Sequence, residues 1–198
     1  MILKKIFPLL TSLAISVTAF AQNTIYPKGL KTGDKAPLFE VADNSGKLFN
    51  LKNQLAKGEV VIIFYRGQWC PFCNKELRRL NDSLSLIIAR GASVIAISPE
   101  TYANVEKTVE KTNASFPIIS DSSMTIMKQY KVNFSVDEGT QKKYLEYGID
   151  FSKANGSNGA NLPVPATYII GKNGLVKYAF FDSDYRVRPS VKELLDHL

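Results

Sequence analysis

The sequence predicts an α/β fold in which helices flank a central mixed β-sheet. Residues 60–65, VVIIFY, form an unbroken apolar run, which is typical of a strand buried on both faces. Residues 71–90 follow with apolar side chains at helical spacing, and residues 92–98 form a second apolar run. A strand, a helix and a strand in this order predict a right-handed parallel crossover.

Weaker signals predict the other elements around this unit. Asn173-Gly174 between apolar runs is a strong hairpin signal, and Ser190 with Glu193 fits a helical capping box. The stretch 131–162 is polar and irregular, with 153–161 expected as a loop. The other expected elements are a hairpin over 39–51, helices over 101–112, 124–130 and 190–198, a short strand over 116–120, and strands over 167–170 and 175–181.

The first 21 residues have the pattern of a secretory signal peptide. A start with two lysines precedes an apolar stretch, and Ala19 and Ala21 provide a small-x-small cleavage site. An uncleaved anchor is the alternative, but the apolar stretch is shorter than the ~20 residues that a spanning helix needs. We therefore expect a signal peptide over 1–21 and one exported domain over 22–198, in a periplasm and without a membrane anchor after cleavage.

The bulk composition fits one soluble globular domain. The chain has 198 residues, of which 45% are hydrophobic, enough for one core. The formal net charge is +7, but basic residues are interspersed with acidic ones and form no stripe. Nucleic acid is therefore not expected as a partner.

The two cysteines, Cys70 and Cys73, stand two residues apart directly after the first buried strand. A structural disulfide stabilises a protein by closing a long loop, and this pair closes almost none. Zinc needs three or four ligands, and the chain has one histidine, His197. The spacing therefore favours a reactive pair, and no metal or cofactor is expected.

The start of a helix makes a cysteine acidic. We expect Cys70 at the N-cap and Pro71 at the first helical position, where its missing N–H is not needed. The positive end of the helix can lower a cysteine pKa from ~8.5 to ~3.5–7.5, and Arg66 adds positive charge. Cys73 lies one turn later on the apolar face, so Cys70 is expected to attack and Cys73 to resolve. The alternative is two small buried hydrophobic residues.

A second feature is the segment LPVPAT, which leads into the expected C-terminal hairpin. Proline is excluded from the interior of a central strand, so Pro165 is expected at a strand start or a special bend. A cis bond at Val164–Pro165 and an ordinary trans turn are both compatible with this placement.

Five blocks together resemble a known family: FYRGQWCPFCNKEL, VIAISPE, FPIISD, LPVPATYIIGKNGLV and FDSDYRVRPS. They resemble the peroxiredoxin-like branch, the alkyl hydroperoxide reductase/thiol-specific antioxidant family, of the thioredoxin-like superfamily. The resemblance implies a thioredoxin-like fold, a redox role for Cys70 and Cys73, and a cis Pro165 beside them. It also makes Trp69 the aromatic flank of the site, although a plain core aromatic is an equal alternative.

The chain departs from the peroxiredoxin pattern Pro-x-x-x-Thr/Ser-x-x-Cys. Laid on it, Arg66 stands at the proline, Cys70 at the threonine and Cys73 at the peroxide-attacking cysteine. The family's arginine near the strand after the loop is also missing. The thioredoxin-like alignment makes Cys70 the nucleophile and the peroxiredoxin alignment makes it Cys73; the helix-end argument favours Cys70.

Three functions follow as hypotheses. The first is a thiol-dependent peroxidase that reduces hydroperoxides and is regenerated by an external, thioredoxin-type dithiol. The second is a thiol-disulfide oxidoreductase that acts on disulfides of exported proteins. The third is a non-catalytic binding module with an idle site.

Overall fold

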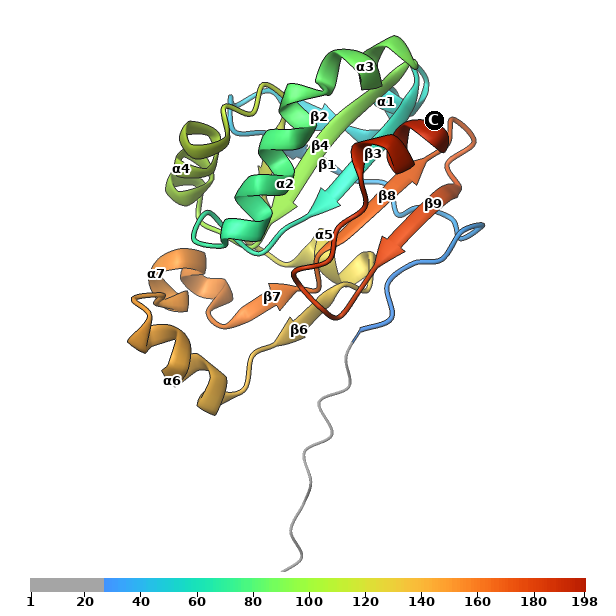
Figure 1. The fold of residues 1–198 in the computed structure, drawn as a ribbon. Helices are drawn as coiled ribbons and strands as arrows, with labels where there is room; N and C mark the ends of the chain where they lie inside the picture. Colours follow the sequence, from blue (N-terminus) through green and yellow to red (C-terminus); the bar gives the residue numbers. More distant parts are fainter. Residues whose placement is uncertain (1–26) are drawn as a thin grey trace, which may run out of the picture.

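The centre of the molecule is a five-stranded mixed sheet with the strand order β5-β4-β3-β8-β9 (Figure 1). The computed structural model describes residues 27–198, so the expected signal peptide lies outside the described residues. β3 is parallel to β4 and β4 to β5, whereas β8 is antiparallel to both β3 and β9. The strands are β3 (Glu59–Phe64), β4 (Ala92–Ser98), β5 (Ile118–Ser120), β8 (Ala166–Ile170) and β9 (Val176–Phe181). The expected mixed α/β sheet is confirmed.

Both faces of the sheet are covered, which explains the unbroken apolar run in β3. Val60, Ile62 and Phe64 pack on one face, and Val61 and Ile63 pack on the other. The first face is covered by α1 (Leu51–Leu55), α5 (Thr125–Gln129) and residues beside the hairpin of β1 (Glu40–Ala42) and β2 (Leu48–Asn50). The second is covered by α2 (Pro71–Asp82), α3 (Leu84–Ala89), α4 (Tyr102–Thr112) and α8 (Val191–Asp196).

The single helix expected over 71–90 is in fact two helices. α2 ends at Asp82, Ser83 adopts φ −108° and ψ 9°, and α3 begins at Leu84. The N–H of Ser83 bonds to the carbonyls of Arg79 and Leu80, which is the tightened bonding of a helix end. Asn, Asp and Ser in succession have low helix propensity, so the helix breaks there without losing its apolar face.

The expectation of an irregular stretch over 131–162 is wrong. This insert contains β6 (Asn133–Ser135), α6 (Glu138–Glu146), α7 (Phe151–Asn155), a 3₁₀ turn η1 (Gly156–Asn158) and β7 (Asn161–Pro163). α6 buries none of its residues, so its sequence carries little apolar periodicity. Asp137 and Asp150 cap the two helices by accepting backbone N–H bonds, and this local polar signal marks them.

The C-terminal segment returns to the start of α2 (Figure 1). After β9, residues 182–190 cross towards α2, where the ring of Tyr185 meets that of Phe72 at 5.8 Å. The chain ends in α8, whose N-cap Ser190 accepts a bond from the N–H of Glu193, as expected. None of the helices within residues 27–198 is long and apolar enough to cross a membrane.

Candidate active site

The site lies at the loop that connects β3 to α2. Cys70 is the N-cap of α2 and Pro71 is its first helical residue, as expected. The intervening loop turns at Gly67, whose φ is +154°. A Cβ there would lie 2.5 Å from Nε1 of Trp69 and 2.8 Å from Oε1 of Glu100, so only glycine fits without displacing them. The loop therefore places Cys70 at the N-terminal end of the helix, where the first N–H groups lack partners within the helix.

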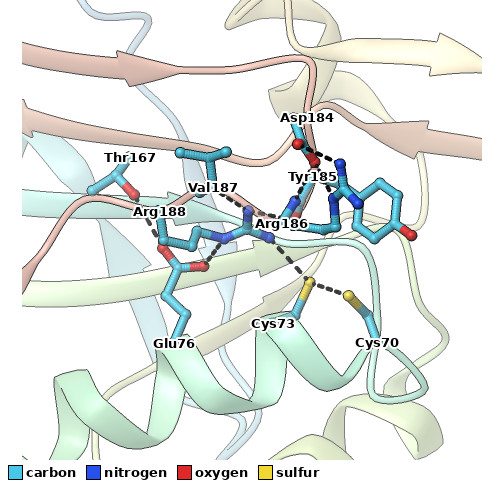
Figure 2. Close-up of polar contacts among 9 residues, drawn as sticks. All are labelled: Cys70, Cys73, Glu76, Thr167, Asp184, Tyr185, Arg186, Val187 and Arg188. Carbon is cyan, nitrogen blue, oxygen red and sulfur yellow. Dashed lines mark hydrogen bonds and ion pairs between the residues drawn. The ribbon is translucent and has the colours of Figure 1, made fainter.

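The two sulfur atoms are adjacent and reduced. Sγ of Cys73 donates to Sγ of Cys70 across 2.9 Å (Figure 2). The side chains are nearly closed off from solvent, with 1% of Cys70 and none of Cys73 exposed. One sulfur can therefore attack the other without rearrangement of the helix.

The two thiols differ in acidity. The hydrogen bond from Cys73, its backbone N–H and the charges of Arg66 and Arg188 lower the pKa of Cys70 to about 6, against the opposing effect of burial. Burial raises the pKa of Cys73 well above its usual value, and its bond to the neighbouring thiolate adds to this. At neutral pH the pair thus holds one negative charge, on Cys70.

Arg188 is a site residue that the sequence analysis missed. Its Nη2 donates to Sγ of Cys73 at 3.6 Å, and its Nε is paired with Oε2 of Glu76 at 2.5 Å (Figure 2). Its Nη1 donates to the carbonyls of Tyr185 and Val187, which fixes the C-terminal segment over the site. The block FDSDYRVRPS is visible in the sequence, but nothing in its local pattern indicates that it reaches the cysteines.

Glu76 was also missed, because it occupies a buried position of an apolar helical face. The carboxyl group is 3% exposed and is held by Arg188 and by the hydroxyl of Thr167 at 3.4 Å. Burial raises its pKa to about 7, which Arg188 opposes and the charge of Cys73 reinforces. A group with this pKa can exchange a proton at neutral pH.

The guanidinium group of Arg66 is surrounded by aromatic rings, and Trp69 is one of them. Its guanidinium carbon is 4.9 Å from the ring centre of Trp69, 5.3 Å from that of Tyr144 and 4.3 Å from that of Tyr185. Its Nη2 also donates to the hydroxyl of Tyr144. Trp69 in turn packs edge-on against Tyr144 and Phe151 of the insert. The insert and the C-terminal segment therefore both contact Arg66, which lies four residues before Cys70.

Pro165 is near this group but is not cis. It lines a cavity of about 200 Å³ together with Arg66 and Tyr185. The peptide bonds of residues 27–198 include no cis bond, so Val164–Pro165 is trans, which is the ordinary alternative, and the cis bond that the resemblance implies is wrong. The chain runs extended from β7 into β8 with Val164 bonded to the carbonyl of Val132, and no tight turn overrides the ordinary trans preference.

The structure thus brings together the expected Arg66, Trp69, Cys70, Pro71 and Cys73, and adds Arg188 and Glu76. Within residues 27–198 no cluster of three or more histidine, cysteine or acidic side chains could hold a metal ion. The residues that the structure brings together suit thiol chemistry: an acidic sulfur, a partner sulfur, two guanidinium groups and a carboxyl group whose pKa is raised to about 7.

Comparisons with known proteins agree with this chemistry. A model of the AhpC/TSA family matches residues 32–179. The thiol-disulfide oxidoreductase ResA of Geobacillus thermodenitrificans is 25% identical over 178 residues, which cover 89% of this chain and 84% of the relative. The chloroplastic peroxiredoxin Q of Populus jackii is 25% identical over 185 residues, which cover 93% of this chain and 75% of the relative.

The fold is similar to that of solved peroxiredoxins. The peroxidoxin BcpB of Mycobacterium tuberculosis superposes with a TM-score of 0.65 at 23% identity, covering 85% of this chain and 96% of that one. Peroxiredoxin Q of Xylella fastidiosa also gives a TM-score of 0.65, at 16% identity, covering 85% and 95%. The expected thioredoxin-like fold is therefore confirmed.

Proposed function

Because the chain belongs to the AhpC/TSA family, we propose that it is a dithiol peroxidase in which Cys70 reduces hydroperoxides and Cys73 resolves the product. Its relatives are thiol-disulfide oxidoreductases and peroxiredoxins, and the chain is accordingly an oxidoreductase rather than an idle binding module. One observation carries the choice of a peroxide. The acidic sulfur of Cys70 is only 1% exposed, which admits a small oxidant more readily than a protein disulfide.

In the first step, the Cys70 thiolate attacks one peroxide oxygen and the O–O bond breaks. Cys70 becomes a sulfenic acid, and the leaving alkoxide takes a proton to give an alcohol. The guanidinium groups of Arg188 and Arg66 are the nearest cations, and both stabilise negative charge at the sulfurs. Peroxiredoxins carry an arginine near the strand that follows the loop, and this chain lacks it there. Arg188 provides a cation from the C-terminal segment instead.

In the second step, Cys73 attacks the sulfenic acid of Cys70. A disulfide forms and water leaves, which takes the hydroxyl group of Cys70 and the proton of Cys73. The 2.9 Å between the sulfurs makes this closure fast relative to encounter with a second peroxide. An external dithiol of the thioredoxin type then reduces the disulfide.

Thiol-disulfide exchange with exported proteins is the second candidate. Beside Cys70, the rings of Phe72 and Tyr185 are 38% and 39% exposed and touch each other, which forms a small apolar surface at the site. Such a surface suits a polypeptide substrate more than a peroxide. The absence of a threonine or serine three residues before Cys73 also favours this alternative.

Stopped-flow oxidation of the reduced protein separates the two candidates. The peroxidase proposal predicts that hydrogen peroxide or an alkyl hydroperoxide oxidises Cys70 at least 100-fold faster than free cysteine at pH 7, and that C70S abolishes the reaction. A rate equal to that of free cysteine, with rapid reduction of a model protein disulfide in the same preparation, would favour the second candidate.

We also propose that the protein is exported to a periplasm, on the basis of residues 1–21. Expression with its own leader, followed by cell fractionation and N-terminal sequencing, tests this. The proposal predicts a periplasmic product that begins at Gln22. A product that keeps Met1 and sediments with membranes contradicts it.

A further inference from the structure

Glu100 is a second buried carboxyl group, and it is bonded to the loop that carries Cys70. It follows β4 and is fully buried. Oε1 accepts the backbone N–H of Gln68 at 2.9 Å, two residues before Cys70. Oε2 accepts the hydroxyls of Thr108 at 3.3 Å and Ser98 at 3.5 Å. Its neutral partners hold the carboxyl group in place but supply no charge.

Glu100 differs from Glu76 in that no cation in the described part of the chain is paired with its carboxyl group. Glu76 is paired with Arg188, whereas none of the ion pairs within residues 27–198 includes Glu100. The titratable groups that interact electrostatically with Glu100 are Cys73 on α2 and Tyr65 after β3. Lys111 bonds to the carbonyl and side chain of Gln68, and Lys107 bonds to Asn104, so neither neutralises the carboxyl group.

Two negative charges in this enclosed site would repel each other. A buried charge without a cation is costly, and a second one nearby raises that cost further. When the dithiol is reduced, Cys70 carries one negative charge and Cys73 holds a proton. When the disulfide forms, neither sulfur is charged. The number of charges that the sulfurs contribute thus changes by one in each cycle.

We propose that Glu100 holds the proton that Cys70 gives up, so that one buried negative charge lies on Glu100 in the disulfide form and on Cys70 in the dithiol form. The inference rests on the proposed dithiol cycle. Reduction by an external dithiol supplies two electrons and two protons: the S–S bond breaks, one proton goes to Cys73 and the other to the carboxylate of Glu100. The total charge of the site is unchanged, because the charge that Glu100 loses appears on Cys70. On oxidation by a peroxide, the proton that Glu100 releases balances the one that the leaving alkoxide takes up.

The surroundings of Glu100 agree with this role. Burial raises its pKa to about 7, the bonds from Gln68 and Thr108 oppose the rise, and a negative charge on Cys73 would raise it further. The carboxyl group can thus change protonation at neutral pH when the charge on the sulfurs changes. Glu100 is a positioning residue in this account: it bonds to the loop that carries Cys70 and does not touch the reacting atoms.

Reduced-minus-oxidised infrared difference spectroscopy of the full domain at pH 7 tests the proposal. Wild type is expected to gain the C=O stretch of a protonated carboxylic acid on reduction. E100Q keeps an acceptor for the N–H of Gln68 but cannot take up the proton, so this band is expected to disappear. E76Q is the matched control and is expected to retain it. A band that is unchanged in E100Q, or lost in E76Q, overturns the proposal.

Thiol counting separates this test from that of the proposed function. If oxidation does not convert two free thiols to none, the dithiol cycle fails and the inference fails with it. If the disulfide forms without a carboxylic acid band, the inference alone fails. If E100Q does not fold, ¹³C NMR of the glutamate carboxyl groups in wild type answers the same question. One buried glutamate that titrates near pH 7 and gains a proton on reduction, while retained in E76Q, supports the role of Glu100.

Discussion

Nη2 of Arg188 lies 3.6 Å from Sγ of Cys73, although 115 positions separate the two residues in the chain. The same guanidinium group is paired with Glu76, so one cation serves a sulfur and a carboxyl group together. The C-terminal segment is therefore part of the active site, and its removal is expected to affect both stability and thiol reactivity.

Replacing Arg188 by methionine leaves the carboxyl group of Glu76 buried without a cation. Breaking a buried ion pair in this way costs about 3–5 kcal/mol, so R188M is expected to lower the free energy of unfolding by that order. The double variant R188M/E76Q removes both charges and is expected to recover much of the loss. Denaturant unfolding of the reduced protein measures both values.

The exposed pair of Arg186 and Asp184 is the control for this prediction. Arg186 is 63% exposed, so R186M is expected to change stability by less than about 1 kcal/mol. If R188M and R186M lowered the free energy of unfolding equally, the buried pair of Arg188 and Glu76 would stabilise the fold no more than an exposed pair does.

The charge of Arg66 acts on Cys70. R66M removes a guanidinium group that lowers the pKa of Cys70, so the pKa is expected to rise above about 6. R66K keeps the charge but not the planar stacking on the aromatic rings, and its pKa is expected to lie between the two. The pH dependence of alkylation by iodoacetamide gives each value, and an R66M profile that overlays that of wild type contradicts the prediction.

The hydrogen bond from Cys73 is the largest cause of the low pKa of Cys70. C73A removes the donor, so the pKa of Cys70 is expected to rise, and C73S retains a hydroxyl donor and is expected to give a smaller rise. Both variants lose the resolving thiol, so peroxide is expected to leave Cys70 as a sulfenic acid that dimedone traps. An equal pKa in C73A and wild type would mean that the S–H···S bond does not stabilise the thiolate.

Gly67 controls the shape of the loop before Cys70. G67A places a methyl group against Trp69 and Glu100, whereas G46A meets no atom within 4 Å, although its φ is +78°. Backbone strain destabilises both variants, but crowding lowers the free energy of unfolding of G67A alone by a further ~1–3 kcal/mol. Unfolding measurements are expected to show this difference, together with a raised Cys70 pKa only in G67A. Equal losses in the two variants would rule out the crowding.

The chain segment that carries the cysteines could be predicted from the sequence because its signals are local. An apolar run, a proline at the first helical position and two cysteines one turn apart define β3, the start of α2 and the sulfur pair. The prediction of a strand over residues 92–98, which the structure shows as β4, also follows from an apolar run. These features depend on periodicity and capping, which a short window of residues contains.

The rest of the site depends on tertiary contacts. Arg188 follows β9 and Glu100 follows β4, and only the folded chain brings these two side chains to the site. Glu76 lies one turn after Cys73 on α2, but its partner Arg188 comes from the distant C-terminal segment. A buried glutamate on an apolar helical face gives no sequence signal of its partner. The insert over 131–162 was missed for a different reason: α6 buries none of its residues and so lacks the apolar period that predicts a helix, and α7 has only five residues, too few to show one.

Titration of the reduced wild-type protein tests the central claim most directly. The ultraviolet absorbance of the thiolate is followed against pH, with C70S and C73S as references for each sulfur. The account predicts that one thiol, lost in C70S, ionises near pH 6 and that the other stays protonated well above the ordinary cysteine value of ~8.5. Two thiols that both ionise near ~8.5 would contradict it.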